Sequence, residues 1–171
     1  HTGTLEISDA NATDITATDI TDINGTNTGT ITVTNTIDIN GSGSEVQAAF
    51  AAIDTNTGNA TANITGTDYT IAQLKAINAA TTGAIVLADA SGALSGTVAD
   101  IKDAFAGTIT THTGTLEISD AGTTDITATD ITSINTTNTG TITVTNTIDI
   151  NGSGSEVEAA FAAIDTNTGN A

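Results

Sequence analysis

The chain has 171 residues, of which 20 are acidic and only two are lysines, so its formal net charge at pH 7 is −18. Such a charge attracts cations and repels nucleic acid and anionic lipid, which excludes polyanionic partners. The absence of Cys excludes disulfides and thiolate metal sites, while a hydrophobic content of 37% without one long apolar run predicts a folded chain with no membrane-inserting segment.

An internal repeat dominates the sequence. Residues 112–171 align with residues 1–60 at an offset of 111, and only five of the 60 aligned pairs differ. We therefore predict one full repeat unit at 1–111, made of about four strand-plus-helix modules, and the first part of the next, nearly identical unit at 112–171. A chain that starts and stops within a repeat is expected to belong to a longer array.

Short runs with apolar residues at alternate positions predict strands, because side chains alternate between the two faces of a strand. Most of these runs follow a Thr-Gly pair, and six of these pairs recur at similar intervals, with their glycines at Gly29, Gly58, Gly83, Gly114, Gly140 and Gly169. In chain order, the apolar positions are Ile31 and Val33, Ala60 to Ile64, Ile85 and Leu87, Leu116 and Ile118, and Ile142 and Val144.

Between the strands, apolar residues change to a spacing of three and four, which predicts short amphipathic helices. Their apolar positions are Val46, Phe50 and Ile53, then Ile71, Leu74 and Ile77, then Val98, Ile101 and Phe105. Ile20 and Ile23 predict a weaker turn, either helical, 3₁₀ or irregular. Large core side chains are expected only from Phe50, Phe105 and Phe161.

The alternation of strand and helix predicts the fold class α/β. We expect a right-handed solenoid of strand-plus-short-helix modules of about 25–31 residues with a stacked parallel sheet. An all-β solenoid is the alternative, favoured by abundant Thr, Ile and Val and by the run ITVTNTIDI, which is long for one strand. The Ala-rich segments that follow capping residues favour the α/β fold.

One acidic motif is a candidate metal site. Its residues are Asp38, Asn40, Ser42 and Glu45, repeated as Asp149, Asn151, Ser153 and Glu156. Oxygen ligands at alternate positions followed by Gly resemble the first half of a calcium loop, but the twelfth position falls on Ala49. Ser42 and Glu45 also match a helix capping box, and the two interpretations are compatible. No cofactor is required, and calcium is the ion expected if one binds.

Other polar residues have a simpler interpretation. The segment from Asp54 to Asn59 could bind a cation, but Asp and Asn are also the usual residues of turns. His1 and His112 occupy one repeat position a full unit apart, so we expect surface residues rather than a catalytic pair. Lys75 and Lys102 are expected on the solvated sides of their helices.

The outward strand face is expected to be uncharged and short-chained. It predicts a self-association face consisting of Thr30, Thr32, Thr34, Thr61, Thr141, Thr143 and Thr145. Rows of Thr at strand spacing also occur in β-solenoid proteins that bind ice, although here Ala, Val and Glu interrupt the rows. The plainest interpretation is that Thr is a favourable exposed strand residue.

Residues 70–121 contain the phrases QLKAIN-x-x-TTG, LSGT-x-A-x-I and AFAGTITTHTG. Here the chain resembles the tandem repeats of giant bacterial, especially cyanobacterial, cell-surface or secreted proteins. The resemblance implies an exported, non-enzymatic protein of the envelope, a sheath, an adhesin stalk or an extracellular fibre. It also implies calcium binding, because the acidic loops of such proteins often indicate that ion.

Together these features predict a non-enzymatic structural repeat segment of a large extracellular or cell-surface protein, forming a rod or self-assembling filament. Its expected partners are further copies of the same repeat, in cis and in trans, as a homo-oligomer or filament. A calcium-dependent adhesin stalk is one alternative and an ice-binding repeat is another. An enzyme would need convergent His, Cys, Lys or Arg side chains, and the chain has almost none of these residues.

Overall fold

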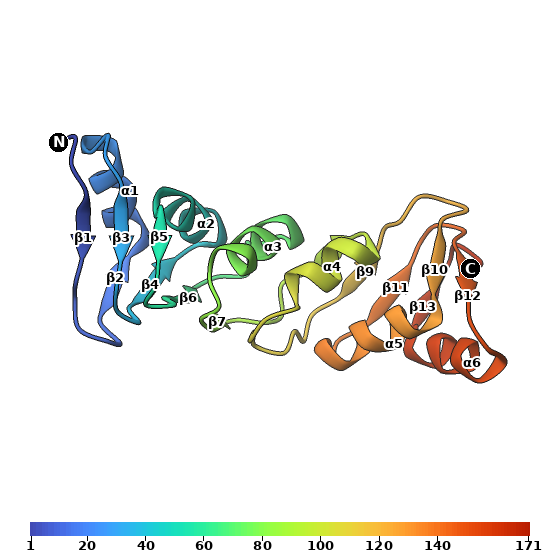
Figure 1. Ribbon diagram of the computed structural model, residues 1–171. Coiled ribbons are helices and arrows are strands. Elements are labelled where there is room, and N and C mark those ends of the chain that lie inside the picture. The colour runs from blue at the N-terminus through green and yellow to red at the C-terminus, as the bar shows by residue number, and fades with distance from the viewer.

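The computed structural model describes residues 1–171 and shows an α/β protein with six helices and thirteen short strands. All strand pairs are parallel. Figure 1 shows the elements following one another along the molecule, with the N-terminus at one end and the C-terminus at the other. The predicted α/β class is confirmed, and the all-β alternative is wrong.

Each module runs through a strand, a second strand and a helix. The first three modules are β1 (Leu5–Ile7), β2 (Asp14–Thr16) and α1 (Ala17–Thr26); β3 (Ile31–Val33), β4 (Asp38–Gly41) and α2 (Gly43–Ala52); and β5 (Thr55–Asn56), β6 (Thr61–Ile64) and α3 (Ile71–Ala80). The next three are β7 (Ile85–Leu87), β8 (Leu94–Gly96) and α4 (Val98–Ala104); β9 (Leu116–Ile118), β10 (Asp125–Thr127) and α5 (Ala128–Thr137); and β11 (Ile142–Val144), β12 (Asp149–Asn151) and α6 (Gly154–Ala163). Strand β13 (Thr166–Asn167) follows α6.

The strands form four small sheets rather than the single sheet that we expected. Their orders are β1-β3-β5, β2-β4-β6-β7, β8-β9-β11-β13 and β10-β12. Paired residues are closest in sequence where Leu94 lies opposite Leu116, and furthest apart where Leu5 lies opposite Ile31 and Leu116 opposite Ile142. The expected module with a single strand is therefore wrong, because each module contributes two strands and repeats at a shorter spacing than we expected.

The strands change partners near the boundary between the two units. Strand β7 is the first strand of its module but pairs with β6, a second strand, whereas β8 is a second strand and pairs with β9, a first strand. The sheet that contains β7 is prolonged only by an isolated bridge from Ile85 to Ile109. No single sheet therefore extends through the whole chain.

Capping residues begin the helices. Thr or Ser precedes each helix, and in five of the six its side chain accepts a hydrogen bond from the backbone N–H three residues later. The three predicted helices are confirmed as α2, α3 and α4. The weak turn at Ile20 is instead a full helix of 10 residues, α1, and its copy is α5. Burial of Ala17 and Ile20 stabilises α1 despite its Thr-rich sequence.

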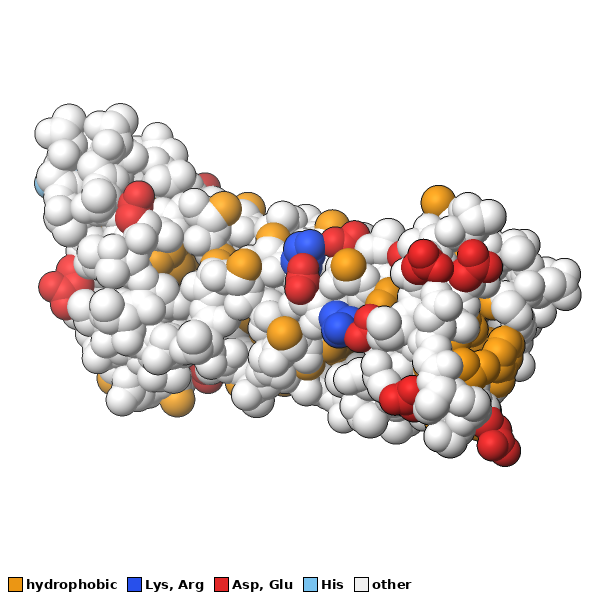
Figure 2. Space-filling view, turned by 45° about the vertical axis from the view of Figure 1, so that its right-hand side comes forward, with side chains coloured by type: hydrophobic (Ala, Val, Ile, Leu, Met, Phe, Trp, Pro, Cys, Tyr) orange, Lys and Arg blue, Asp and Glu red, His pale blue; other side chains and the backbone are white.

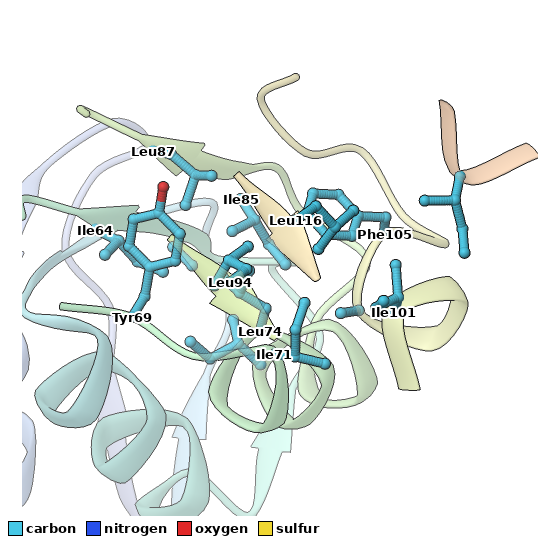
Figure 3. Packing of buried hydrophobic residues seen from close by; sticks show 14 of the residues in the cluster. Ile64, Tyr69, Ile71, Leu74, Ile85, Leu87, Leu94, Ile101, Phe105 and Leu116 are labelled. Atoms are coloured by element: carbon cyan, nitrogen blue, oxygen red, sulfur yellow. The ribbon is translucent and has the colours of Figure 1, made fainter. Parts of the chain in front are cut away.

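Strands and helices enclose one continuous core of 36 buried apolar residues, most of them Ile, Leu, Val and Ala. All five predicted strands lie on it, as β3, β6, β7, β9 and β11. Figure 3 shows the Tyr69 ring beside Ile64 and Leu87, and the Tyr69 hydroxyl donates to the carbonyl oxygen of Asp89 at 3.0 Å. The expectation that all three Phe are buried is wrong, because Phe161 is 41% exposed whereas Phe50 is 3% exposed.

Phe50 and Phe161 provide a matched test of this core. Replacing Phe50 with Ala should reduce the free energy of unfolding by about 3–5 kcal/mol, because the side chain leaves a cavity between packed elements. The same change at Phe161 should cost under roughly 1 kcal/mol, since water already reaches that ring. Urea unfolding of both variants would measure the difference, and equal losses would contradict the assigned packing.

Candidate functional site

The candidate metal motif is used in part to start helix α2. The backbone N–H and the side-chain hydroxyl of Ser42 both donate to Glu45 Oε2 at 2.8 Å. In return, the Glu45 N–H donates to Ser42 Oγ at 3.4 Å. These bonds, above all the one from the Ser42 backbone, lower the pKa of Glu45. In the second unit Ser153 N–H donates to Glu156 at 2.7 Å, and the pKa of Glu156 is lowered by hydrogen bonds from Ser153. The predicted capping box is confirmed.

The other two residues of the motif link neighbouring strands. Asn40 Nδ2 donates to Asp14 Oδ1 on strand β2 at 3.0 Å, and Asn151 donates to Asp125 at 2.8 Å in the second unit. The parallel register places Asp14 opposite Asp38. No three His, Cys, Asp or Glu side chains converge into a group that could hold a metal ion. Calcium binding by this motif stays a prediction.

The turn after Asp54 connects two successive modules. Asp54 Oδ2 accepts a hydrogen bond from the Ile31 N–H at 2.8 Å, and Asp165 repeats this contact with Ile142. Asn59 adopts a left-handed conformation with φ of 53°. At Gly58, a Cβ atom would overlap the backbone of Asn35, so a side chain has no room there. The local structure therefore accounts for this segment as a turn.

The predicted self-association residues lie on three different sheets. Thr30, Thr32 and Thr34 flank or lie on β3, in the sheet of the first unit, while Thr141, Thr143 and Thr145 occupy the same places around β11. Thr61 lies on β6, which belongs to another sheet. The structure therefore does not place Thr61 in one row with the others.

The exposed threonines also contact their neighbours. Thr34 donates to Glu6 at 3.0 Å and Thr145 donates to Glu117 at 2.8 Å. Along the sheet β8-β9-β11-β13 the face is a shallow, open hollow of about 400 Å³, lined by Ala93, Leu94, Ser95, Thr115, Glu117, Thr143, Thr145, Thr166 and Thr168. Such a face is mostly uncharged, but a carboxylate interrupts its threonines.

His112 was not recognised from the sequence as a buried residue. Its ring is fully buried, with Nδ1 at 2.7 Å from Asn138 Oδ1 and Nε2 at 2.6 Å from the carbonyl oxygen of Gly92. The Phe105 ring packs edge-on against it with a centroid separation of 6.2 Å. The expected surface position is therefore wrong for His112 because residues of the preceding module cover it. His1 has no such cover and is exposed.

The two lysines join three consecutive helices. Lys75 Nζ on α3 lies 2.7 Å from Asp100 Oδ1 and 2.9 Å from Asp103 Oδ2, both on α4. Lys102 on α4 pairs with Asp130 on α5. Figure 2 shows each lysine beside an acidic side chain near the middle of the molecule. These pairs lower the pKa of Asp100 and of Asp130. Both lysines are partly solvated, as expected, but they also cross-link helices.

Comparison with models of protein families, with curated proteins and with solved structures finds no match to this chain. None of its helices has the length and apolar character needed to cross a membrane. The functional interpretation therefore depends on the hydrogen bonds and ion pairs of the chain itself. Apart from the helix caps at Ser42 and Ser153, these contacts join side chains of one module to the backbone or side chains of an adjacent module.

Removal of His112 should be costly. His112→Ala leaves the carbonyl of Gly92 and the Asn138 amide oxygen without their partner, which should lower the free energy of unfolding by about 3 kcal/mol. His1→Ala is the matched control at the same repeat position and should change stability little. Thermal or urea unfolding of both variants tests this, and an equally small loss at His112 would contradict the buried assignment.

Low pH should reduce the free energy of unfolding, because it protonates the carboxylates that form ion pairs. The folded pKa of Asp100 is lowered from its ordinary value of 3.8, chiefly by the hydrogen bond from Lys75, so its contribution to stability is present above that value and is lost as pH falls through the folded pKa. Urea unfolding of Asp100→Asn should show a flatter decline below about pH 4 than the parent chain. Asp22→Asn, at an exposed position, is the control, and parallel curves for Asp100→Asn and the parent would contradict the pairing.

Proposed function

We propose that this chain is a non-enzymatic structural segment of a large extracellular or cell-surface protein, in which stacked modules form a rod or self-assembling filament. The proposed architecture is a right-handed solenoid, the usual hand for parallel strands joined by helical crossovers. The observation that carries the proposal is the parallel pairing between strands of successive modules, as from Leu5 to Ile31 and from Leu94 to Leu116. Pairing between successive modules allows an array to grow without a change in the joint.

The polar contacts support the same interpretation. The Asp54 contact to Ile31 recurs unchanged from Asp165 to Ile142, both at 2.8 Å, and the link from Thr34 to Glu6 recurs as the link from Thr145 to Glu117. Near-identical units therefore build near-identical internal contacts. Identity between adjacent globular domains would invite misassembly, but in a stacked array it makes every joint equivalent.

The proposal of a non-enzymatic role rests on the positions of the lysines and of His112, which are the side chains best suited to acid, base or nucleophilic catalysis. The lysines are held in ion pairs with Asp100, Asp103 and Asp130. His112 is buried between Asn138 and Gly92. An acid, base or nucleophile would need to face a substrate pocket, and these groups are used instead to connect modules.

A calcium-dependent adhesin stalk is the second candidate, and one observation favours it. Asp14 lies opposite Asp38 on adjacent parallel strands, and Asp125 lies opposite Asp149 in the second unit. Like charges placed directly across a strand pair repel each other, so a bound cation would relieve that repulsion. The ice-binding alternative has weaker support, because Glu6 lies beside Thr32 and Glu117 beside Thr143.

Electron microscopy of a chain with several repeat units, prepared once with calcium and once with chelator, tests the proposal. We expect uniform rods or fibres in both preparations, with each unit adding about 20 Å if four strands stack at about 4.8 Å. Rods that appear only with calcium would instead support the adhesin stalk and a ligand role for Asp38 and Asn40. Compact particles whose length does not grow with the number of units would contradict both.

A further inference from the structure

The C-terminal end of the molecule exposes apolar residues whose repeat equivalents are buried. Phe161 is 41% exposed, whereas Phe50 is 3% exposed. Ile150 and Val157 are partly exposed, whereas their equivalents Ile39 and Val46 are fully buried. Figure 2 shows hydrophobic side chains gathered at this end of the molecule. We call the surface formed by Ile150, Gly154, Val157 and Phe161 the C-terminal end face.

Two equivalent glycines identify what covers this face in the first unit. A Cβ atom added to Gly43 would lie 2.8 Å from Tyr69 Cβ and 2.9 Å from Tyr69 Cα, which is closer than real Cβ contacts. At Gly154, a Cβ atom would meet nothing within 4 Å. The segment that leads into α3 is therefore seated on Gly43, and the same seat at Gly154 is open.

The N-terminal end of the molecule has the complementary feature. Asp120 is buried and its Oδ2 accepts a hydrogen bond from the Val98 N–H at 2.8 Å, so the second unit caps helix α4 of the first. Its equivalent, Asp9, is exposed. Asp130 binds Lys102, while its equivalent, Asp19, is exposed. The surface formed by Leu5, Asp9, Ile15, Asp19 and Ile23, here called the N-terminal end face, therefore matches a segment with the sequence of α4.

Two segments could cover these faces, namely one with the sequence of residues 61–111 or the acidic end of a second chain, and their charges distinguish them. Residues 1–60 and 112–171 each contain eight acidic residues and no lysine, whereas residues 61–111 contain four acidic residues and both lysines. The three segments thus have net charges of −8, −8 and −2, which add to the −18 of the chain. Direct docking of one chain's C-terminal end on another's N-terminal end would bring two acidic segments together without a lysine.

We propose that the C-terminal end face binds a polypeptide segment with the sequence of residues 61–111, which we call the lysine half-unit. This inference rests on the proposed structural function and specifies its joint. The start of the lysine half-unit packs on Gly154 and on the helix that carries Phe161, as the Tyr69 segment packs on Gly43 and α3 packs against α2. Its second helix, which has the sequence of α4, presents its N-terminus and the lysine equivalent to Lys102 to an N-terminal end face. Acidic segments therefore join only through a lysine half-unit, which prevents the array from skipping half a repeat.

Extension of the chain tests this proposal. Residues 61–111 are added after Ala171, in the order that they follow Ala60, and Gly154→Ala is compared in the original and the extended chain. In the original chain the change should leave the melting temperature unchanged or slightly raised, because Ala favours a helix. In the extended chain it should lower the melting temperature by at least about 3 °C, as Gly43→Ala should in both chains.

Phe161→Ala provides a second measurement, and Glu158→Gln is the control. Phe161→Ala should lower the melting temperature of the extended chain more than that of the original chain. Glu158→Gln restores the residue found at Gln47 in the first unit and should behave alike in both chains. Equal effects of Gly154→Ala and of Phe161→Ala in the two chains would overturn the proposal.

Sedimentation of the original chain tests the rival occupant. We expect a monomer at every concentration, whereas dimers abolished by Phe161→Ala would show that a second copy covers the face and would overturn the choice of the lysine half-unit. Electron microscopy of multi-unit chains separates this inference from the proposed function. If rods form but Gly154→Ala lowers the melting temperature no more in the extended chain than in the original one, only the proposed joint is overturned and the filament stands. A Gly154 effect in chains that form no rods would support the joint and count against the filament.

Discussion

Parallel hydrogen bonding between strands of successive modules is the constraint on which the rest of the structure depends. The strands have two to four residues, too few to be stable alone, and they obtain partners only from the modules on either side. Each helix must therefore return the chain to the start of the next strand over a short stretch, such as the one from Leu94 to Leu116. Short helices and small residues such as Ala49 and Ala128, both fully buried, meet that requirement.

An acidic chain with two lysines and no Arg cannot hold its modules together by many ion pairs. Asn, Thr and Asp side chains bind backbone groups of the neighbouring module instead, as in the contact from Asp54 to Ile31. No buried side-chain nitrogen or oxygen lacks a hydrogen-bond partner. The few charge pairs are concentrated where helices α3, α4 and α5 meet, which is also where the sheets change partners. Residues 61–111, which contain both lysines and the change of strand partners, are thus joined to their neighbours differently from residues 1–60.

The proposed function follows from this distribution of contacts. Side chains such as Lys75, Lys102 and His112 bind an adjacent module, and the candidate metal residues Ser42 and Glu45 serve a helix cap. The surfaces that remain are the threonine faces and the two ends. The ends carry the apolar residues and carboxylates that would continue the array, which makes end-to-end growth a simpler role for the chain than recognition of a small ligand.

The sequence by itself determined the alignment of 112–171 with 1–60, the α/β class, five strands and three helices, because apolar spacing and capping residues are local signals. It also predicted the capping box at Ser42 and Glu45. Only the tertiary structure decided that ITVTNTIDI divides into β3 and β4 and that α1 is a complete helix. It also separated equivalent residues: His112 and Phe50 are buried while His1 and Phe161 are exposed. Identical local sequences cannot encode that difference, since burial depends on whether a neighbouring module covers the residue.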